Sequence, residues 1–221
     1  MDTEEKLSPQ SFLKKFSKKT DITKLKGLKI SSSQFSDALY NLTGSSGVIN
    51  GIMPLFDTRV MGKVVTVITA EDDWGTSVKA IDVAKKGELL FIHVNGDNSA
   101  IWGELTSKTA QEKGIVGTII YGAVRDVGAI KDIKYPVFSK NIVPNAGRPK
   151  AEGKINIPVD CGDITINPQD FIIGDECGIV VVPKELLDEV INETLNIKKK
   201  EKKIISKVEN GHSLSDILEL K

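Results

Sequence analysis

The sequence predicts an α/β fold with a first half of alternating strands and helices, a second half rich in short strands, and helices at both ends. Three observations predict this. Between about residues 63 and 140, β-branched apolar runs alternate with apolar residues at helical spacing. Between residues 135 and 183, short apolar runs are separated by Pro, Gly and Asn, as in hairpins. From residue 184, apolar residues return to helical spacing.

In the first half, the elements follow from periodicity and from residues that end helices. Continuous runs such as KVVTVIT are typical of buried strands. Gly87 and Gly114 stop two of the helices, because glycine readily adopts the backbone conformation that ends a helix. The expected helices cover residues 8–19, 34–42, 76–85 and 102–113, and the expected strands cover residues 63–69, 88–94 and 115–120.

The second half predicts a small β-layer, with one or two helices after it. The runs KINIPV, DITI, DFIIG and GIVVVP are too short and too close together for further strand–helix–strand units. No Pro/Gly-rich linker divides the chain. We therefore expect a single domain over residues 1–221, with its core at about 33–183 and a helical extension over 184–221.

Composition and charge argue against several classes of function. The 221 residues carry thirty basic and thirty acidic side chains, so no net field attracts nucleic acid or an acidic membrane. No apolar run approaches the roughly 20 residues that span a bilayer. The two cysteines, Cys161 and Cys177, form neither a disulfide framework nor a CxxC metal site, and we expect both to be buried structural thiols. We expect a cytoplasmic protein with neither nucleic acid nor membrane as a partner.

The charged pair Arg125-Asp126 directly follows the strand expected at 115–120. It should therefore lie at the carboxyl end of that strand, where open α/β sheets bind ligands. Arginine is scarce, with three against 27 lysines, and its planar fork suits a carboxylate. The alternative is structural: Asp126 could cap the next helix while Arg125 pairs with a surface acid. Arg148, in NAGRPK, could contact a second carboxylate of a substrate or lie in solvent.

A second candidate is the loop that begins at Gly96 and leads into a helix, with Gly103 expected in the first helical turn. Free backbone N–H groups at a helix start, together with the helix dipole, bind carboxylates and phosphates. Many ordinary strand-to-helix connections share this composition. The alternative is therefore an ordinary connecting loop in which Asp97 or Ser99 caps the helix.

The segment GDNSAIWGELTSKTAQEKGIVGTIIYGAVRDVGAIKDIKYPVFSK resembles the RraA-like family, named after the regulator of ribonuclease activity A. Its enzymatic members are 4-hydroxy-4-methyl-2-oxoglutarate aldolases and oxaloacetate decarboxylases. The family motif is an acidic residue, twenty intervening residues and Arg-Asp, matched here by Glu104 and Arg125-Asp126. INIPVDCGDITINPQDFIIGDECGIVVVP is also similar to the family, and the resemblance is strong over residues 33–183.

The resemblance implies a role for each site residue. Asp126 would be the direct ligand of a divalent metal, Mg²⁺ or Mn²⁺, and Glu104 would orient the water molecules of that ion. Arg125 would stabilise the developing oxyanion. Glu201, in KKKEKK, would reach the site from a neighbouring subunit, or it is simply a solvated charge. The backbone N–H groups around residues 101–105 would bind the substrate carboxylate, which involves Ile101, Trp102, Gly103, Glu104 and Leu105.

The resemblance further implies a layered β/β/α swivelling-type domain that assembles as a homotrimer or hexamer. The implied activity is a metal-dependent lyase that cleaves a C–C bond of small 2-oxo acids, by aldol cleavage or oxaloacetate decarboxylation, and yields pyruvate. A non-catalytic protein that binds and inhibits a ribonuclease or another partner is the alternative. The acid, the arginine and the aspartate favour the enzyme, because a pure binder has no need of their spacing.

Overall fold

The structure, a computed structural model, describes Leu25 and residues 27–220. The helix expected at residues 8–19 lies outside the described residues. A large mixed sheet forms the centre, with its main strands in the order β1-β12-β11-β3-β4-β6-β7-β2. Among residues 27–220, no helix is both long enough and apolar enough to cross a membrane.

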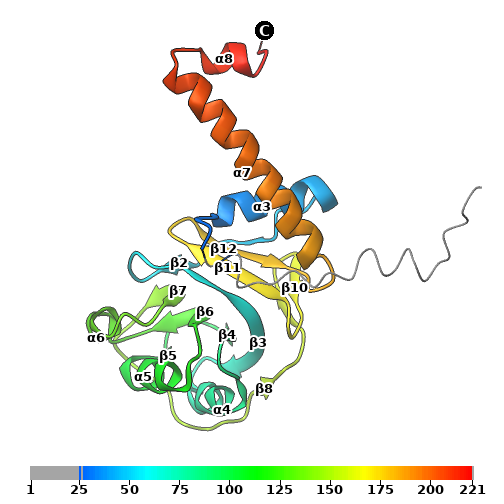
Figure 1. The fold of residues 1–221 in the computed structure, drawn as a ribbon. Coiled ribbons are helices and arrows are strands. Elements are labelled where there is room, and N and C mark those ends of the chain that lie inside the picture. Colours follow the sequence, from blue (N-terminus) through cyan, green and yellow to red (C-terminus); the bar gives the residue numbers. More distant parts are fainter. Residues whose placement is uncertain (1–24, 26, 221) are drawn as a thin grey trace, which may run out of the picture.

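The parallel part of the sheet holds the strands expected from the first half of the chain. Helices cover one of its faces (Figure 1) and bury small side chains, among them Ala80 and Ala110, against it. Both faces of these strands are buried, which explains their continuous apolar runs. The parallel strands are β3 (Val60–Ala70), β4 (Leu89–Asn95), β6 (Gly117–Val124) and β7 (Val137–Ile142), and the helices are α4 (Gly75–Val83), α5 (Glu104–Lys113) and α6 (Val127–Asp132).

The short strands of the second half extend the sheet and cover its other face. β3 is longer than expected because its first residues pair with the antiparallel β11 before the rest pairs with β4. A second core lies under the β9–β10 hairpin and includes Phe91, Ile119 and Cys161. The elements are β1 (Val48–Ile49), β2 (Met53–Pro54), β8 (Lys154–Ile155), β9 (Val159–Cys161), β10 (Ile164–Ile166), β11 (Phe171–Asp175) and β12 (Gly178–Val182).

The remaining helices are α3 (Ser32–Thr43), α7 (Leu187–Glu209) and α8 (Leu214–Ile217). α3 and the first part of α7 pack on β11 and β12, where Phe35, Phe171 and Val190 belong to a third core cluster. The far part of α7 projects away from the sheet and carries α8 at its end (Figure 1). The expected α/β class, with a mixed sheet and terminal helices, is confirmed.

One boundary of the expected elements is wrong where it affects the site. A helix was expected to begin at Trp102, but residues Ala100–Trp102 form a short strand, β5, which pairs with β6. The helix begins only at Glu104. Trp102 is buried and donates a hydrogen bond from Nε1 to Ser107 Oγ at 2.7 Å. Trp102 adopts a strand conformation because its segment pairs with residues 123–124, and local periodicity does not reveal such a pairing.

Candidate functional site

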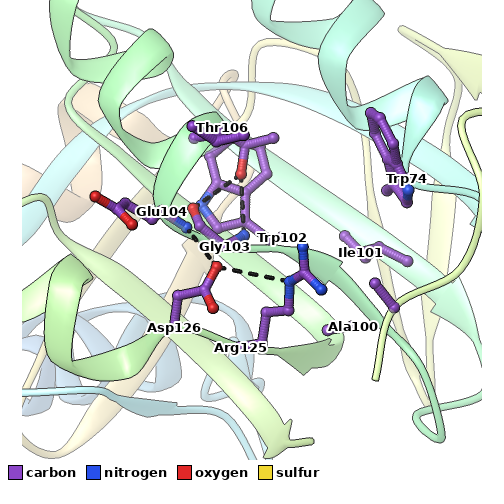
Figure 2. A pocket seen from close by; sticks show the side chains of 11 residues that line it. Trp74, Ala100, Ile101, Trp102, Gly103, Glu104, Thr106, Arg125 and Asp126 are labelled. Carbon is purple, nitrogen blue, oxygen red and sulfur yellow. Dashed lines mark hydrogen bonds and ion pairs between the residues drawn. The ribbon is translucent and has the colours of Figure 1, made fainter. Parts of the chain in front are cut away.

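The ends of β5 and β6 meet beside the start of α5 and form an open pocket (Figure 2). The backbone N–H of Arg125 donates to the carbonyl of Trp102 at 3.0 Å, which joins the two strand ends. Arg125 and Asp126 thus lie at the carboxyl end of a parallel strand, as expected. The residues that line the pocket are Trp74, Ala100, Ile101, Trp102, Gly103, Glu104, Leu105, Thr106, Arg125, Asp126 and Ala146.

Asp126 has a left-handed backbone, with φ 57° and ψ 35°. It occupies the cap position of α6, yet its side chain makes no capping hydrogen bond to that helix. Instead Oδ2 accepts a hydrogen bond from the backbone N–H of Glu104 at 3.2 Å and lies 3.6 Å from Arg125 Nε. The side chain is 41% exposed. The structural alternative, in which Asp126 caps its own helix, therefore does not hold.

Gly103 is required by the close approach of Asp126. A Cβ atom at this position would lie 2.5 Å from Asp126 Oδ2 and 3.2 Å from Arg125 Cγ. The backbone of Gly103 is extended, with φ −163°, so its need for glycine comes from space and not from torsion. Any larger residue would displace the carboxylate from its place against α5.

The first turn of α5 leaves backbone donors facing the pocket. The first intrahelical hydrogen bond runs from Ser107 N–H to Gly103 O, so the helix provides no acceptor for the N–H groups of Leu105 and Thr106. The N–H of Gly103 is already used, because it donates to Thr106 Oγ1 at 3.0 Å. Of the amides expected to bind a carboxylate, those at Gly103 and Glu104 thus have internal partners, while that of Leu105 remains available.

Seven of the eight expected site residues gather around this one pocket: Ile101, Trp102, Gly103, Glu104, Leu105, Arg125 and Asp126. The side chain of Glu104 points away from Asp126 (Figure 2), and only its backbone approaches that carboxylate. Glu201 lies elsewhere, on α7, where Gln34 of α3 donates to its carboxylate. The role of Glu201 at a neighbouring subunit's site stays a prediction.

The donor set around Asp126 fits a hard ion that keeps most of its water. No group of three or more His, Cys, Asp or Glu side chains suited to a metal exists among the described residues. A fully protein-made cage is therefore not available in that part of the chain. Mg²⁺ commonly binds through one or two carboxylates and completes its shell with water and ligand oxygens. The half-exposed Asp126 carboxylate suits that mode of binding.

Sequence reasoning missed the opposite wall of the pocket, formed by Trp74 and Ala146, and the buried Asp73 that holds it. Asp73 accepts from the N–H groups of Ala151 and Glu152 at 2.8 and 3.0 Å, which ties that loop to the end of β3. Burial favours the protonated acid, but hydrogen bonds from Thr76 and these amides outweigh it and hold the pKa of Asp73 below its usual value. An acid two residues before the Gly-Thr start of a helix was the available indication.

The two cysteines and His93 have structural surroundings. Cys161 is buried, as expected, and burial raises the pKa of its thiol to about 12. Cys177 is exposed, so the expectation of a buried thiol is wrong there; it lies in the turn between β11 and β12. His93 stacks on Tyr121 with ring centroids 5.1 Å apart. Burial, and then the nearby charge of Lys140, lowers the pKa of His93.

Comparison with known proteins identifies the family. The model of the RraA-like family, described as Aldolase/RraA, matches residues 32–181. The chain belongs to the RraA-like family. An uncharacterized relative from Methanocaldococcus jannaschii is 43% identical over 177 residues, which cover 78% of this chain and 85% of the relative. A Thermus thermophilus protein named 4-hydroxy-4-methyl-2-oxoglutarate aldolase is 25% identical over 127 residues, which cover 57% of this chain and 77% of that protein.

Solved structures of RraA-like and similar proteins agree with the fold. An uncharacterized protein from Pseudomonas syringae pv. tomato has a TM-score of 0.77 at 28% identity and covers 88% of this chain and 94% of its own. The RNA-processing inhibitor RraA from Thermus thermophilus has a TM-score of 0.61 at 21% identity and covers 67% of this chain and 92% of its own. At that identity the second likeness establishes the fold alone.

Proposed function

We propose that this RraA-like protein is a divalent-metal-dependent lyase that cleaves a C–C bond of small 2-oxo acids and releases pyruvate. The single observation that carries the proposal is the placement of Arg125 and Asp126 against Gly103 and the first turn of α5 in one pocket. This arrangement combines a cation, an ion ligand and free backbone donors, which a structural turn does not need. The aldolase name of a relative supports the same chemistry.

The reaction requires a place for one electron pair. In aldol cleavage of a 4-hydroxy-2-oxo acid, the C3–C4 bond breaks, the hydroxyl proton passes to water, and C4 becomes a carbonyl. The electron pair stays on the pyruvate fragment as an enolate, which then takes a proton at C3. Oxaloacetate instead loses CO₂ from the same bond and needs no base. A divalent ion, when bound, supplies Lewis-acid stabilisation of the negative charge that both reactions develop.

The residues of the chain divide the remaining tasks. Asp126 would hold the Mg²⁺ or Mn²⁺ ion with one carboxylate. Arg125, held beside it, offers a fixed positive donor to the oxyanion, which is a preorganised form of stabilisation. The N–H groups of Leu105 and Thr106, at the positive end of α5, would orient the carboxylate of the substrate. Glu104 would contact the water around the ion if its side chain turned toward Asp126.

Assembly and location complete the proposal. We propose a cytoplasmic homotrimer or hexamer in which Glu201 from a neighbouring subunit reaches the pocket. The far part of α7 projects from its own domain (Figure 1), which supports contact with a neighbouring subunit. Glu201 would have to leave its contact with Gln34 of its own α3 to enter that subunit's pocket. Glu201→Gln should then lower activity without affecting the pocket of its own chain. Unchanged activity in Glu201→Gln would remove this residue from the mechanism.

The test is pyruvate release from oxaloacetate and from 4-hydroxy-4-methyl-2-oxoglutarate, with Mg²⁺ or Mn²⁺ and after chelation. Asp126→Asn should abolish both the activity and Mn²⁺ binding measured by calorimetry. Asp132→Asn is the matched control, because it removes an exposed carboxylate from the neighbouring α6 without touching the pocket. Arg125→Lys keeps the charge but loses the planar fork, so a large loss of turnover is expected. Activity that survives both chelation and Asp126→Asn would refute the metal mechanism, whereas absence of pyruvate release from both substrates would favour the non-catalytic ribonuclease inhibitor.

A further inference from the structure

Helix α5 begins without the side chain that usually caps a helix. A capping side chain, on the residue before the helix, accepts hydrogen bonds from the second or third backbone N–H of the helix. That residue is Gly103, and the Asp126 carboxylate fills the space where its side chain would lie. Neither the helix nor its cap residue therefore provides an acceptor for the N–H groups of Leu105 and Thr106, which remain available to a ligand.

The side chain of Thr106 holds the glycine in place. Its Oγ1 atom accepts a hydrogen bond from the N–H of Gly103 at 3.0 Å and donates one to the carbonyl of Gly103 at 3.0 Å (Figure 2). In a capping box, the cap side chain binds a helix amide while the third helical side chain binds the N–H of the cap residue. The start of α5 keeps the second contact and lacks the first, so the cap residue is fixed while the helix amides stay free.

Glycine needs such a contact because it has the largest backbone freedom of any residue. The bond from the Gly103 N–H to Thr106 spans both backbone torsions of the glycine, so it fixes the direction in which α5 leaves β5. A second link lies beside it, where Trp102 Nε1 donates to the buried Ser107 Oγ at 2.7 Å. Thr106 lines the pocket and Ser107 does not, so Thr106 provides the link on the ligand side.

The junction at Gly103 sets the distance between the two parts of the site. Asp126 follows β6, which pairs with β5, whereas the N–H groups of Leu105 and Thr106 belong to α5. The two parts meet where the N–H of Glu104 donates to Asp126 Oδ2 at 3.2 Å. A 2-oxo acid that binds an ion at Asp126 while its carboxylate meets the α5 amides needs this distance to be fixed.

We propose that Thr106 is a positioning residue for substrate binding, whose hydroxyl fixes Gly103 so that the free amides of α5 stay aligned with a ligand at Asp126. The inference rests on the proposed function and adds a residue to it. Thr106 acts through Gly103, because the hydrogen of its hydroxyl is already donated to the Gly103 carbonyl.

The experiment removes the hydroxyl and then restores it. Thr106→Val keeps the size and the branched Cβ of threonine but has no hydroxyl. On the full chain with Mn²⁺, its KM for oxaloacetate should rise about ten-fold while kcat stays within about three-fold of the parent value, because the lost alignment weakens binding of the carboxylate. Thr106→Ser restores the hydroxyl, so its KM should lie within about two-fold of the parent value.

Affinity for the ion distinguishes Thr106 from its neighbour. Thr106 has no hydrogen bond to Asp126, so Thr106→Val should bind Mn²⁺ within about two-fold of the parent Kd in calorimetry. Gly103→Ala displaces the Asp126 carboxylate itself and should weaken Mn²⁺ binding. Thr109→Val is the matched control, because Thr109 is exposed on the same helix, does not line the pocket and donates to the Leu105 carbonyl at 2.8 Å. It should keep the parent KM.

A purely structural role has a different result. In that case Thr106→Val would lower the free energy of unfolding and leave the KM of the folded protein unchanged, which would overturn the inference. An equal rise of KM in Thr106→Ser and Thr106→Val would overturn it as well. If Thr106→Val does not fold, Thr106→Ala provides the same comparison with Thr106→Ser.

Binding separates this inference from the proposed function. Calorimetric titration of the Mn²⁺-loaded protein with pyruvate should give about ten-fold weaker binding in Thr106→Val and parent-like binding in Thr106→Ser and Thr109→Val. Absence of pyruvate release from every substrate would refute the lyase function, and the binding ratios would still decide the role of Thr106. Parent protein that binds no pyruvate would overturn the role of Thr106.

Discussion

Replacing Asp73 should destabilise the protein more than replacing any exposed acid, because its buried carboxylate accepts five hydrogen bonds. Oδ1 accepts from the N–H groups of Gly75 and Ala151 at 2.9 and 2.8 Å. Oδ2 accepts from Thr69, Thr76 and the N–H of Glu152 at 3.0, 2.7 and 3.0 Å. Asp73→Ala leaves three backbone donors without an acceptor, each costing about 1 kcal/mol or more, so a loss of about 3 kcal/mol is expected.

Asp73→Asn separates hydrogen bonding from shape. Either threonine hydroxyl can rotate and accept, but a backbone N–H cannot. The NH₂ group of the asparagine therefore fits best at the Oδ2 position. There only one backbone donor, the N–H of Glu152, would face another donor. One opposed backbone donor predicts a loss of about 1–2 kcal/mol, intermediate between the parent protein and Asp73→Ala. The measurement is the free energy of unfolding in urea, followed by tryptophan fluorescence.

The pH dependence gives a second, independent check. The folded-state pKa of Asp73 is below its unfolded value of about 4, so the unfolded chain binds the proton more readily. The stabilisation is fully present above about pH 5 and is lost as the pH falls toward the folded-state pKa. The advantage of the parent protein over Asp73→Asn should thus be constant near neutral pH and shrink below about pH 4. A difference that stays constant from pH 7 to pH 3, or a loss under 0.5 kcal/mol in Asp73→Ala, would refute the reasoning.

Three further predictions concern single contacts. Gly103→Ala should lower kcat/KM about 100-fold, because the added Cβ atom would displace the Asp126 carboxylate. Gly128→Ala is the control and should keep full activity, because its Cβ atom would meet nothing within 4 Å. Trp102→Phe removes the 2.7 Å hydrogen bond to Ser107 and should cost about 1–3 kcal/mol of unfolding free energy in urea, whereas an unchanged value would mean that Ser107 finds another partner. His93 should titrate below the usual imidazole pKa of about 6.5 in an NMR pH series, and stability should fall as the pH drops through that range; titration at or above 6.5 would contradict its burial.

The parallel strands could be predicted from sequence because burial on both faces imposes a continuous apolar run. The expected strand at 115–120 lies largely within β6, which continues to Val124, directly before Arg125. This position could be deduced because parallel sheets place ligands at the carboxyl ends of their strands. The family motif then identified Glu104 as the acidic partner of Arg125-Asp126.

The rest of the site depends on contacts between distant segments. β5 is only three residues long and exists through pairing with β6, so the Trp102 segment resembled the start of a helix. Acidic runs such as the one before Trp74 are typical of surface turns, and only the loop at residues 145–152 buries Asp73 and places Trp74 in the pocket. Local patterns of polarity carry no information about such long-range partners.

The left-handed backbone at Asp126 explains why a carboxylate at a helix start is left free for a ligand. An aspartate in this position commonly has an extended backbone and turns its side chain onto the first amides of its own helix. With φ 57°, Asp126 instead turns its side chain back to the start of α5, where it meets Glu104 N–H and Arg125. Such a backbone costs about 1–3 kcal/mol in a residue other than glycine, and strained residues of this kind cluster at functional sites. The conformation leaves α6 without a capping hydrogen bond from this side chain. It places the carboxylate between the N-terminal ends of α5 and α6, where a bound cation and an anionic substrate would lie in the same electrostatic field.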